Sequence, residues 1–450
     1  MTGRYKAYPE YKSTDEVWLG DVPSHWRDLK INRLTIVKRG ASPRPIDDPK
    51  YFDESGEYAW VRIADVTASD TYLANTTQRL SPLGASLSVK LEPNELFLSI
   101  AGTVGKPCIN KIKACIHDGF VYFPEYKENT KFLFYIFAAG EAYKGLGKFG
   151  TQLNLNTETV GGIKIGIPCI EEQHKIVNFL DHETAKIDTL IAKQEKLIEL
   201  LKEKRQAVIS HAVTKGLNPD APMKDSGVEW LGEVPEHWSL AKLGLHARKI
   251  GSGKTPRGGA DVYQDSGVLF LRSQNIYDEG LRISGKEATY ISDEIHLEMQ
   301  NTKVKPQDIL LNITGGSIGR TCIVPRDIGE ANVNQHVCIL RFSTNLAPYL
   351  ANVMKSSSIK EQIDVVQVGG NREGLNFEQI SNMKFCLPPK DEIGKINNFI
   401  EVHSEKYQTL VTKANAAIEL IKERKSALIS AAVTGKIDVR DWAVLDKDQG

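Results

Sequence analysis

The sequence predicts an α/β protein with an internal repeat, in which two mixed α/β domains are joined by two long helices that form an antiparallel coiled coil with pseudo-two-fold symmetry. Three observations predict this fold class: a tryptophan-containing motif that occurs twice, a pair of nearly identical helical segments, and two divergent stretches with strand-like runs. The length of 450 residues allows about three domains of roughly 150 residues each, so two modules and a helical part fit.

The tryptophan motif opens each half of the chain. Residues 16–26 read EVWLGDVPSHW and residues 228–238 read VEWLGEVPEHW. The offset of 212 residues between Trp18 and Trp230 recurs between Trp26 and Trp238. A catalytic or metal-binding histidine needs partners at ligand spacing, and none recur near His25 or His237. We therefore expect these histidines to pack or to cap a turn, and the tryptophans to anchor the first strand of each module.

The helical segments are 167–216 and 387–437. IELLKEKRQAVISHAVTKG (198–216) and IELIKERKSALISAAVTGK (418–436) lie 220 residues apart. Apolar residues recur at steps of three and four, acids lead, bases follow, and Gly216 and Gly435 suit the C-terminal ends. About 44 residues would make a helix roughly 66 Å long. Since one such helix cannot bury its own apolar stripe, we expect the two to pair, and antiparallel pairing relates the halves by symmetry.

The divergent modules are 16–166 and 228–386, joined by a polar linker at 217–227 and followed by a tail at 438–450. Five short matches link them. They include SPR (42–44) with TPR (255–257), Arg62 with Arg272, and ACIHDGFVYF (114–123) with ANVNQHVCIL (331–340). A helix is expected at 131–144, and strands bounded by turn residues at 58–63, 95–100, 120–123, 267–272, 308–313 and 336–342.

Composition excludes several classes of protein. No run approaches 18 apolar residues, so no membrane span is expected. The six cysteines contain no CxxC pair, which argues against a zinc site or a disulfide framework and favours a reducing cytoplasm. The 57 basic and 57 acidic residues balance, so binding to a polyanion would need local patches.

The duplicated WLGxVPxHW opening and the closing helix together resemble the specificity subunit of type I restriction-modification enzymes, from about Val17 to Gly435. The resemblance implies two target-recognition domains that each read one half of a split double-stranded DNA sequence. It implies that the helices act as a spacer and dock two methyltransferase (modification) subunits, through which restriction/translocase subunits join. It further implies a non-catalytic chain that binds no cofactor itself, with S-adenosylmethionine, ATP and Mg on the partner subunits.

Candidate DNA contacts are polar side chains in the loops of each module. Arginine pairs with guanine and Asn or Gln with adenine, while Lys, Arg, Ser and Thr hold phosphates. Gly369 and Gly370 would let the loop that follows approach a groove closely. The plainer interpretation is a set of solvated turns. The candidates are Ser42, Arg44, Arg62, Gln152 and Asn154 in the first module, and Lys254, Thr255, Arg257, Arg272, Gln274, Asn275, Asn334, Gln335, Asn371 and Arg372 in the second.

Other interpretations stay open at this point. GSGKT (251–255) suggests a phosphate-binding loop, but Arg248 stands where the first glycine is needed and Pro256 follows directly. Asp118, Glu125 and Lys127 mimic a metal-nuclease triad that the second half lacks. The alternatives to a DNA-reading subunit are therefore a cryptic metal nuclease or NTPase, and an adaptor that binds no DNA. The basic runs at 202–205 and 422–425 are diluted by acids and suit a solvated or protein-docking face.

Overall fold

The computed structural model describes residues 5–143, 146, 155–367 and 374–443, and the chain forms two compact units. Unit one comprises Met1–Gln194 and Ala416–Gly450, and unit two comprises Glu195–Asn415. Two long helices, α5 (Ile170–Thr214) and α11 (Lys390–Val433), each pass from one unit into the other. Each unit therefore contains part of both predicted helical segments.

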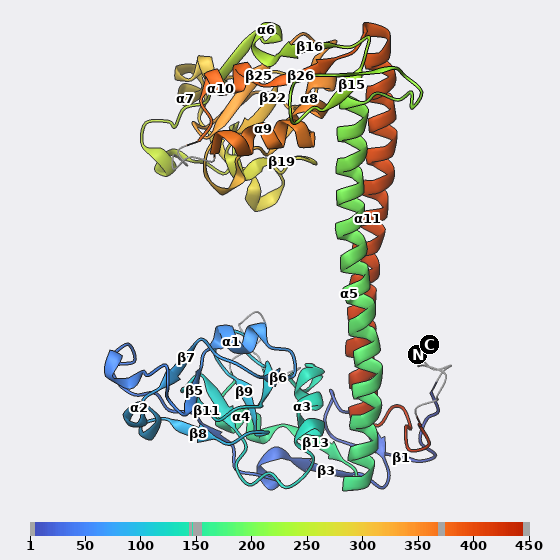
Figure 1. Cartoon of the computed structure of the whole chain (residues 1–450). Helices are drawn as coiled ribbons and strands as arrows, with labels where there is room; N and C mark the ends of the chain where they lie inside the picture. The colour runs from blue at the N-terminus through green and yellow to red at the C-terminus, as the bar shows by residue number, and fades with distance from the viewer. Residues whose placement is uncertain (1–4, 144–145, 147–154, 368–373, 444–450) are drawn as a thin grey trace. The chain divides into compact units, whose positions relative to one another are not determined.

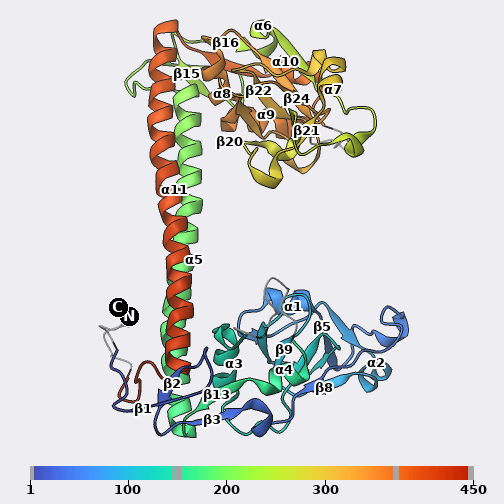
Figure 2. The same cartoon turned by 180° about the vertical axis from the view of Figure 1, so that it is seen from behind.

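The long helices pair antiparallel, as the sequence predicts. In unit one, Phe179 and Ile187 from the start of α5 share a core with Leu428 and Val433 from the end of α11. In unit two the relation is reversed, because the end of α5 packs with the start of α11. Figures 1 and 2 show the two ribbons running together. Gly216 and Gly435 lie just beyond the helix ends with φ of 78° and 70°, the left-handed conformation that commonly terminates a helix.

A hairpin opens each unit and starts earlier than the sequence indicates. In unit one β1 (Tyr11–Ser13) pairs with β2 (Asp21–Pro23), and in unit two β14 (Met223–Asp225) pairs with β15 (Glu233–Pro235) in the same register. β1 thus lies before the predicted module start at residue 16, and β14 lies within the predicted linker at 217–227. These strands are mostly exposed, so they carry no alternation of apolar residues that would reveal them.

Unit one contains a mixed α/β module of three sheets (Figure 1). The five-stranded sheet runs β4 (Lys38–Arg39), β12 (Phe120–Tyr122), β9 (Leu96–Ser99), β10 (Pro107–Asn110), β6 (Tyr72–Leu73). The four-stranded sheet runs β7 (Gln78–Leu80), β5 (Tyr58–Val61), β11 (Ala114–Ile116), β8 (Val89–Leu91), and a third pairs β13 (Lys164–Ile167) with β3 (Arg27–Lys30). The helices are α1 (Ile63–Ala68), α2 (Pro82–Ser86), α3 (Thr130–Ala138) and α4 (Thr157–Gly162).

Unit two repeats this topology. Its main sheet runs β17 (Lys249–Ser252), β25 (Val337–Arg341), β22 (Ile309–Asn312), β23 (Thr321–Ile323), and a second runs β21 (Tyr290–Ile291), β18 (Val268–Leu271), β24 (Ala331–Val333). The two-stranded sheets are β16 (Ser239–Lys242) with β26 (Lys384–Leu387), and β19 (Ile276–Tyr277) with β20 (Gly280–Leu281). The helices are α6 (Leu243–His246), α7 (Asp293–Glu298), α8 (Ala347–Lys355), α9 (Ser357–Gln367) and α10 (Phe377–Asn382). The parallel pair β5 and β11 thus corresponds to β18 and β24.

The predicted elements inside the modules are largely confirmed. All six predicted strands form, as β5, β9, β12, β18, β22 and β25. The helix expected at 131–144 ends earlier, at Ala138, because Gly140 adopts a φ of 73°. The first residues of the tail expected from residue 438 pack against unit one. Asp438 donates its backbone N–H to the Lys6 carbonyl at 2.7 Å, and Val439 is buried. No helix in the described ranges is long and apolar enough to cross a membrane.

The duplicated histidine and tryptophan attach each module to a helix. His25 Nε2 lies 2.9 Å from Glu172 Oε2, and the Trp26 indole donates to Glu172 Oε1 at 3.0 Å. In unit two His237 and Trp238 contact Glu392 at 2.7 and 3.0 Å. Both glutamates lie in the first turn of a long helix, where the helix dipole favours a negative charge. The histidines therefore have a structural role at the start of the helix.

Candidate nucleic-acid interface

Each module carries a short arm that follows the edge strand of its main sheet. The arm is Ser42-Pro43-Arg44 after β4 in unit one and Thr255-Pro256-Arg257 after β17 in unit two. A glycine precedes each arm where the backbones nearly touch: a Cβ on Gly40 would lie 2.1 Å from the His117 carbonyl oxygen, and one on Gly253 would lie 1.9 Å from that of Val333. Only glycine fits there, so the sequence places both arms in the same way.

Each arm contacts the loop that follows a strand of the second sheet, β11 in unit one and β24 in unit two. The Ser42 hydroxyl donates to Asp118 Oδ1 and the Arg44 guanidinium to Asp118 Oδ2, both at 3.0 Å. In unit two the Thr255 hydroxyl bonds to the side chain of Gln335, which occupies the position of Asp118. The arms are thus alike, but a carboxylate faces one and an amide faces the other. Arg44, Lys254 and Arg257 are exposed and can reach a ligand from solvent.

Asp118 is a charged group in this loop. Partial burial by itself would raise the pKa of Asp118, but the Ser42 hydroxyl and the Arg44 and Arg39 charges outweigh it and lower the pKa. Burial lowers the pKa of the neighbouring His117, and the Asp118 charge only partly opposes this. The loop therefore presents a carboxylate beside a neutral imidazole at neutral pH.

The nuclease interpretation does not fit these contacts. The two carboxylate oxygens of Asp118 accept from Ser42 and Arg44, whereas a metal would need them as ligands. Across the described ranges, no group of three or more His, Cys, Asp or Glu side chains could hold a metal ion. Residues 251–255 also form no phosphate-binding loop, because β17 continues to Ser252 and the next element is a short 3-10 helix at Gly259–Val262. A phosphate-binding loop needs an α-helix directly after it.

Arg62 and Arg272 occupy equivalent positions at the ends of β5 and β18. The Arg62 backbone N–H donates to the Asp65 side chain, and the Arg272 backbone N–H donates to the Asn275 side chain, each at 2.9 Å. Each guanidinium also donates to a threonine hydroxyl, that of Thr77 or Thr289. The match that the sequence predicts between these arginines is therefore present in the backbone and in the side chains.

A cleft of about 630 Å³ lies beside Arg62 in unit one. It contains groups that the sequence did not single out, above all Gln78, which lies on β7 opposite Trp60 of β5. The glutamine amide can pair with adenine and the arginine with guanine, so the cleft offers two base-reading donors. The sequence did not indicate Gln78, because candidate DNA contacts were chosen among polar residues of loops and Gln78 lies in a strand. The lining is Ile46, Asp47, Pro49, Phe52, Trp60, Arg62, Gln78 and His117.

Two of the candidate DNA contacts are buried and hydrogen-bonded within the module. Asn275 is buried, accepts from the Arg272 backbone N–H, and donates to the carbonyls of Arg282 and Glu287 at 2.7 and 2.9 Å. Asn334 is also buried and accepts from the His336 backbone N–H at 3.2 Å. Both amides are thus less accessible to a ligand than the exposed candidates. Gln274 and Gln335 are exposed, whereas Gln152, Asn154, Asn371 and Arg372 lie outside the described residues.

The two modules share one fold, and each is attached to the same pair of helices. Each also carries an exposed arm that contains an arginine. These features define a class of protein with two related polar surfaces. The sequence profile of the type I restriction modification DNA specificity domain matches residues 23–200 and 248–420. The chain belongs to this family, and the resemblance noted in the sequence is confirmed.

Similar proteins carry the same designation. The EcoBI type I restriction enzyme specificity subunit of Escherichia coli is 26% identical over 66% of this chain, although the match spans only 63% of that subunit. The StySPI specificity subunit of Salmonella potsdam is 23% identical over 95% of this chain and 92% of its own length. A chain from a solved type I R-M system covers 92% of this chain and 99% of its own, with a TM-score of 0.65 and 14% identity. That likeness supports the fold.

Proposed function

We propose that this chain is the DNA-reading subunit of a type I restriction-modification complex, in which each module reads one half of a bipartite double-stranded target. The paired helices dock two methyltransferase subunits, and restriction/translocase subunits join through these. The chain itself performs no catalysis and binds no cofactor; S-adenosylmethionine, ATP and Mg act on the partner subunits. The complex works in the cytoplasm, as the reduced cysteines suggest.

One observation carries this proposal: the same arm occurs in both modules but faces different side chains. Ser42 and Arg44 bond to Asp118, whereas Thr255 bonds to Gln335. Donors that are fixed by the fold suit phosphates, which are the same in every sequence. Variable side chains at one position suit bases, which differ between half-sites. An adaptor that binds no DNA has no need for this combination.

The helices support docking of the same partner twice. Leu190 and Leu410 are repeat equivalents that are 50% and 39% exposed, and Leu200 and Leu420 are equivalents that are 48% and 66% exposed. A single exposed leucine needs no explanation. Two apolar side chains exposed at both copies of the same repeat positions fit one kind of protein subunit that binds once to each unit.

A titration of DNA binding against salt tests the reading function. The whole assembled complex is tested with duplexes that contain or lack the target found by methylation mapping. DNA reading predicts that log affinity falls linearly with log salt, and that the target binds at least about 10³-fold more tightly than other DNA. Equal affinity for all duplexes at every salt concentration would leave the adaptor alternative. Cleavage of DNA by this chain alone would favour the nuclease.

A further inference from the structure

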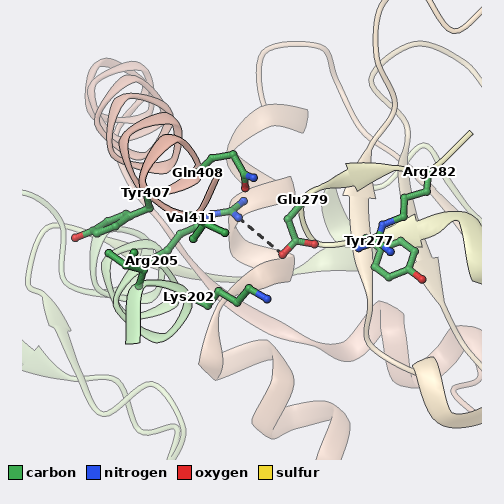
Figure 3. Close-up of a pocket in the computed structure, with 9 residues that line it drawn as sticks. Lys202, Arg205, Tyr277, Glu279, Arg282, Tyr407, Gln408 and Val411 are labelled. Atoms are coloured by element: carbon green, nitrogen blue, oxygen red, sulfur yellow. Dashed lines mark ion pairs between the residues drawn. The ribbon is translucent and has the colours of Figure 1, made fainter. Parts of the chain in front are cut away.

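A second cleft lies inside unit two, away from the arms. It has a volume of about 400 Å³ and lies between the β19–β20 hairpin and the paired helices. Lys202 and Arg205 come from α5, Gln408 from α11, and Tyr277 and Arg282 from the hairpin strands and the residue after them (Figure 3). Two parts of the chain that are far apart in sequence thus turn basic side chains toward one space.

The cleft has an excess of positive charge. Lys202, Arg205 and Arg282 face one acid, Glu279, whose Oε1 lies 3.9 Å from Arg205 NH1 (Figure 3). This distance is at the outer limit of an ion pair. The nearby Asp278 contributes little negative charge, because Lys360 pairs with it at 2.9 Å. Two of the three positive charges in the cleft are therefore not balanced.

Two features show that the cleft is ready for an anion. Arg205 Nε is buried, and no acceptor in the described part of the chain bonds to it, so this guanidinium has an unsatisfied donor. Arg282 is held over the Tyr277 ring at 3.6 Å, which fixes its guanidinium by cation–π attraction. Lys202 and Arg282 are exposed at the rim, where a bulky ligand can reach them.

The repeat provides an internal comparison. In unit one Lys425 occupies the position of Arg205, and Asp188 occupies that of Gln408. Lys425 Nζ lies 2.5 Å from Asp188 Oδ1, so this cation is neutralised. The nearby cleft of unit one is lined by Asp181 and Asp188, and Lys131 pairs with Asp181 at 2.7 Å. The same scaffold position thus has a close ion pair in unit one and only a contact of 3.9 Å in unit two.

We propose that the unit-two cleft binds a phosphate of the DNA backbone, and that unit one makes no equivalent contact. This inference rests on the proposed function. It favours DNA over an acidic partner protein because Tyr277, Glu279 and Arg282 belong to the divergent module. A subunit that docks twice on repeated helices does not meet these residues twice, whereas the DNA of the second half-site meets them once. The contact adds affinity without reading sequence.

The test compares the salt dependence of two matched variants of the full chain in its assembled complex. The double variant Arg205→Gln with Arg282→Gln removes two positive charges from the unit-two cleft. The variant Lys425→Gln changes the residue of unit one that is equivalent to Arg205. One lost phosphate contact reduces the slope of log affinity against log salt by about 0.9. We expect that reduction for the double variant on target and non-target duplexes alike, with an unchanged specificity ratio, and no change for Lys425→Gln.

A modified duplex tests the proposal without any substitution. Phosphates are made neutral one at a time by methylphosphonate linkages across the target and the gap. We expect one position on the side of the second half-site to weaken binding of the wild type but not of the double variant. An unchanged slope together with no such position would overturn the inference, even if sequence-specific binding persists. Weakened assembly with methyltransferase subunits at normal DNA affinity would overturn it in favour of a protein ligand.

Discussion

Glu172 and Glu392 show how one carboxylate fastens a module to a helix. Glu172 is almost fully buried and accepts from Tyr8 at 2.7 Å as well as from Trp26. Burial and the Glu172 carboxylate raise the pKa of Tyr8, so the tyrosine stays a neutral donor. Glu392 bonds only to His237 and Trp238 among the interactions described, and its side chain is 29% exposed.

Glu172→Ala should therefore cost more stability than Glu392→Ala. Glu172→Ala leaves the buried Trp26 and Tyr8 donors without an acceptor, which should lower the free energy of unfolding by about 2–4 kcal/mol. In Glu392→Ala, water can accept some of the hydrogen bonds that the partly exposed carboxylate accepted. Urea unfolding followed by tryptophan fluorescence measures both. Equal losses, or a larger loss for Glu392→Ala, would contradict this account of the two contacts.

Asp118, the acid that the first arm contacts, has a testable effect on DNA affinity. Asp118→Gln gives the first module the side chain that the second has, and removes a negative charge close to the expected phosphates. We expect affinity for non-target duplexes to rise about two- to fivefold, which corresponds to about 0.5–1 kcal/mol for an exposed charge. We also expect the base preference to change at one position of the first half-site. Because the pKa of Asp118 is lowered, the effect should persist into mildly acidic pH. Reduced affinity for every duplex would show that Asp118 supports binding.

Arg62 and Arg272 should each affect one half of the target. If Arg62 reads a guanine, Arg62→Ala costs about 1–3 kcal/mol of discrimination at one base position of the first half-site. Arg272→Ala is the matched variant for the second half-site. Competition binding with single-base substitutions measures both. A uniform loss on all sequences would assign these arginines to phosphates instead.

Residue roles were the part of the site that the sequence predicted least well. The matches of Ser42 with Thr255 and of Arg62 with Arg272 were visible, because short motifs survive around them. The role of Asn275 was not, because an exposed reader and a buried cap are the same residue type, and only burial and partners distinguish them. The contact of His25 with Glu172 joins residues 147 apart, beyond any local pattern.

At the scale of elements, the repeat made the long helices predictable. The helices α5 (Ile170–Thr214) and α11 (Lys390–Val433) lie within the predicted segments 167–216 and 387–437, close to their ends. The prediction succeeded because the apolar periodicity, the order of charges and the terminal glycines all indicate the same boundaries. The hairpin strands β1 and β14 escaped prediction because both are mostly exposed. Glycine at 435 is also fixed by packing, since a Cβ there would lie 2.3 Å from Pro23 Cδ.

The helices should set the gap between the half-sites. Four residues inserted into α5 near Gln194, with four in α11 near Asn415, lengthen both helices by about 6 Å and nearly keep their helical phase. Since a base pair rises about 3.4 Å, the gap should grow by one or two base pairs. Two residues in each helix would turn the apolar stripe by about 200° and should abolish assembly. An active four-residue variant with the original gap would show that the helices do not set the distance.

At the scale of the whole molecule, the proposed function requires two modules that work independently. Each unit has its own apolar core, a hairpin and the end of one helix beside the start of the other. The sequence predicted this duplication, but not the division of each helix between two units, because a continuous helix gives no local sign of where a compact unit ends.

The most direct test exchanges residues 27–167, from the start of β3 to the end of β13, for the same module of a relative with a different target. The hairpin, both long helices and unit two stay unchanged, so assembly should persist. Methylation mapping of cells that carry the exchanged chain then reads both half-sites. We predict that the half-site read by the first module changes to that of the relative, while the other half-site and the gap stay the same. A change in both half-sites, or in neither, would contradict the claim that each module reads one half of the target.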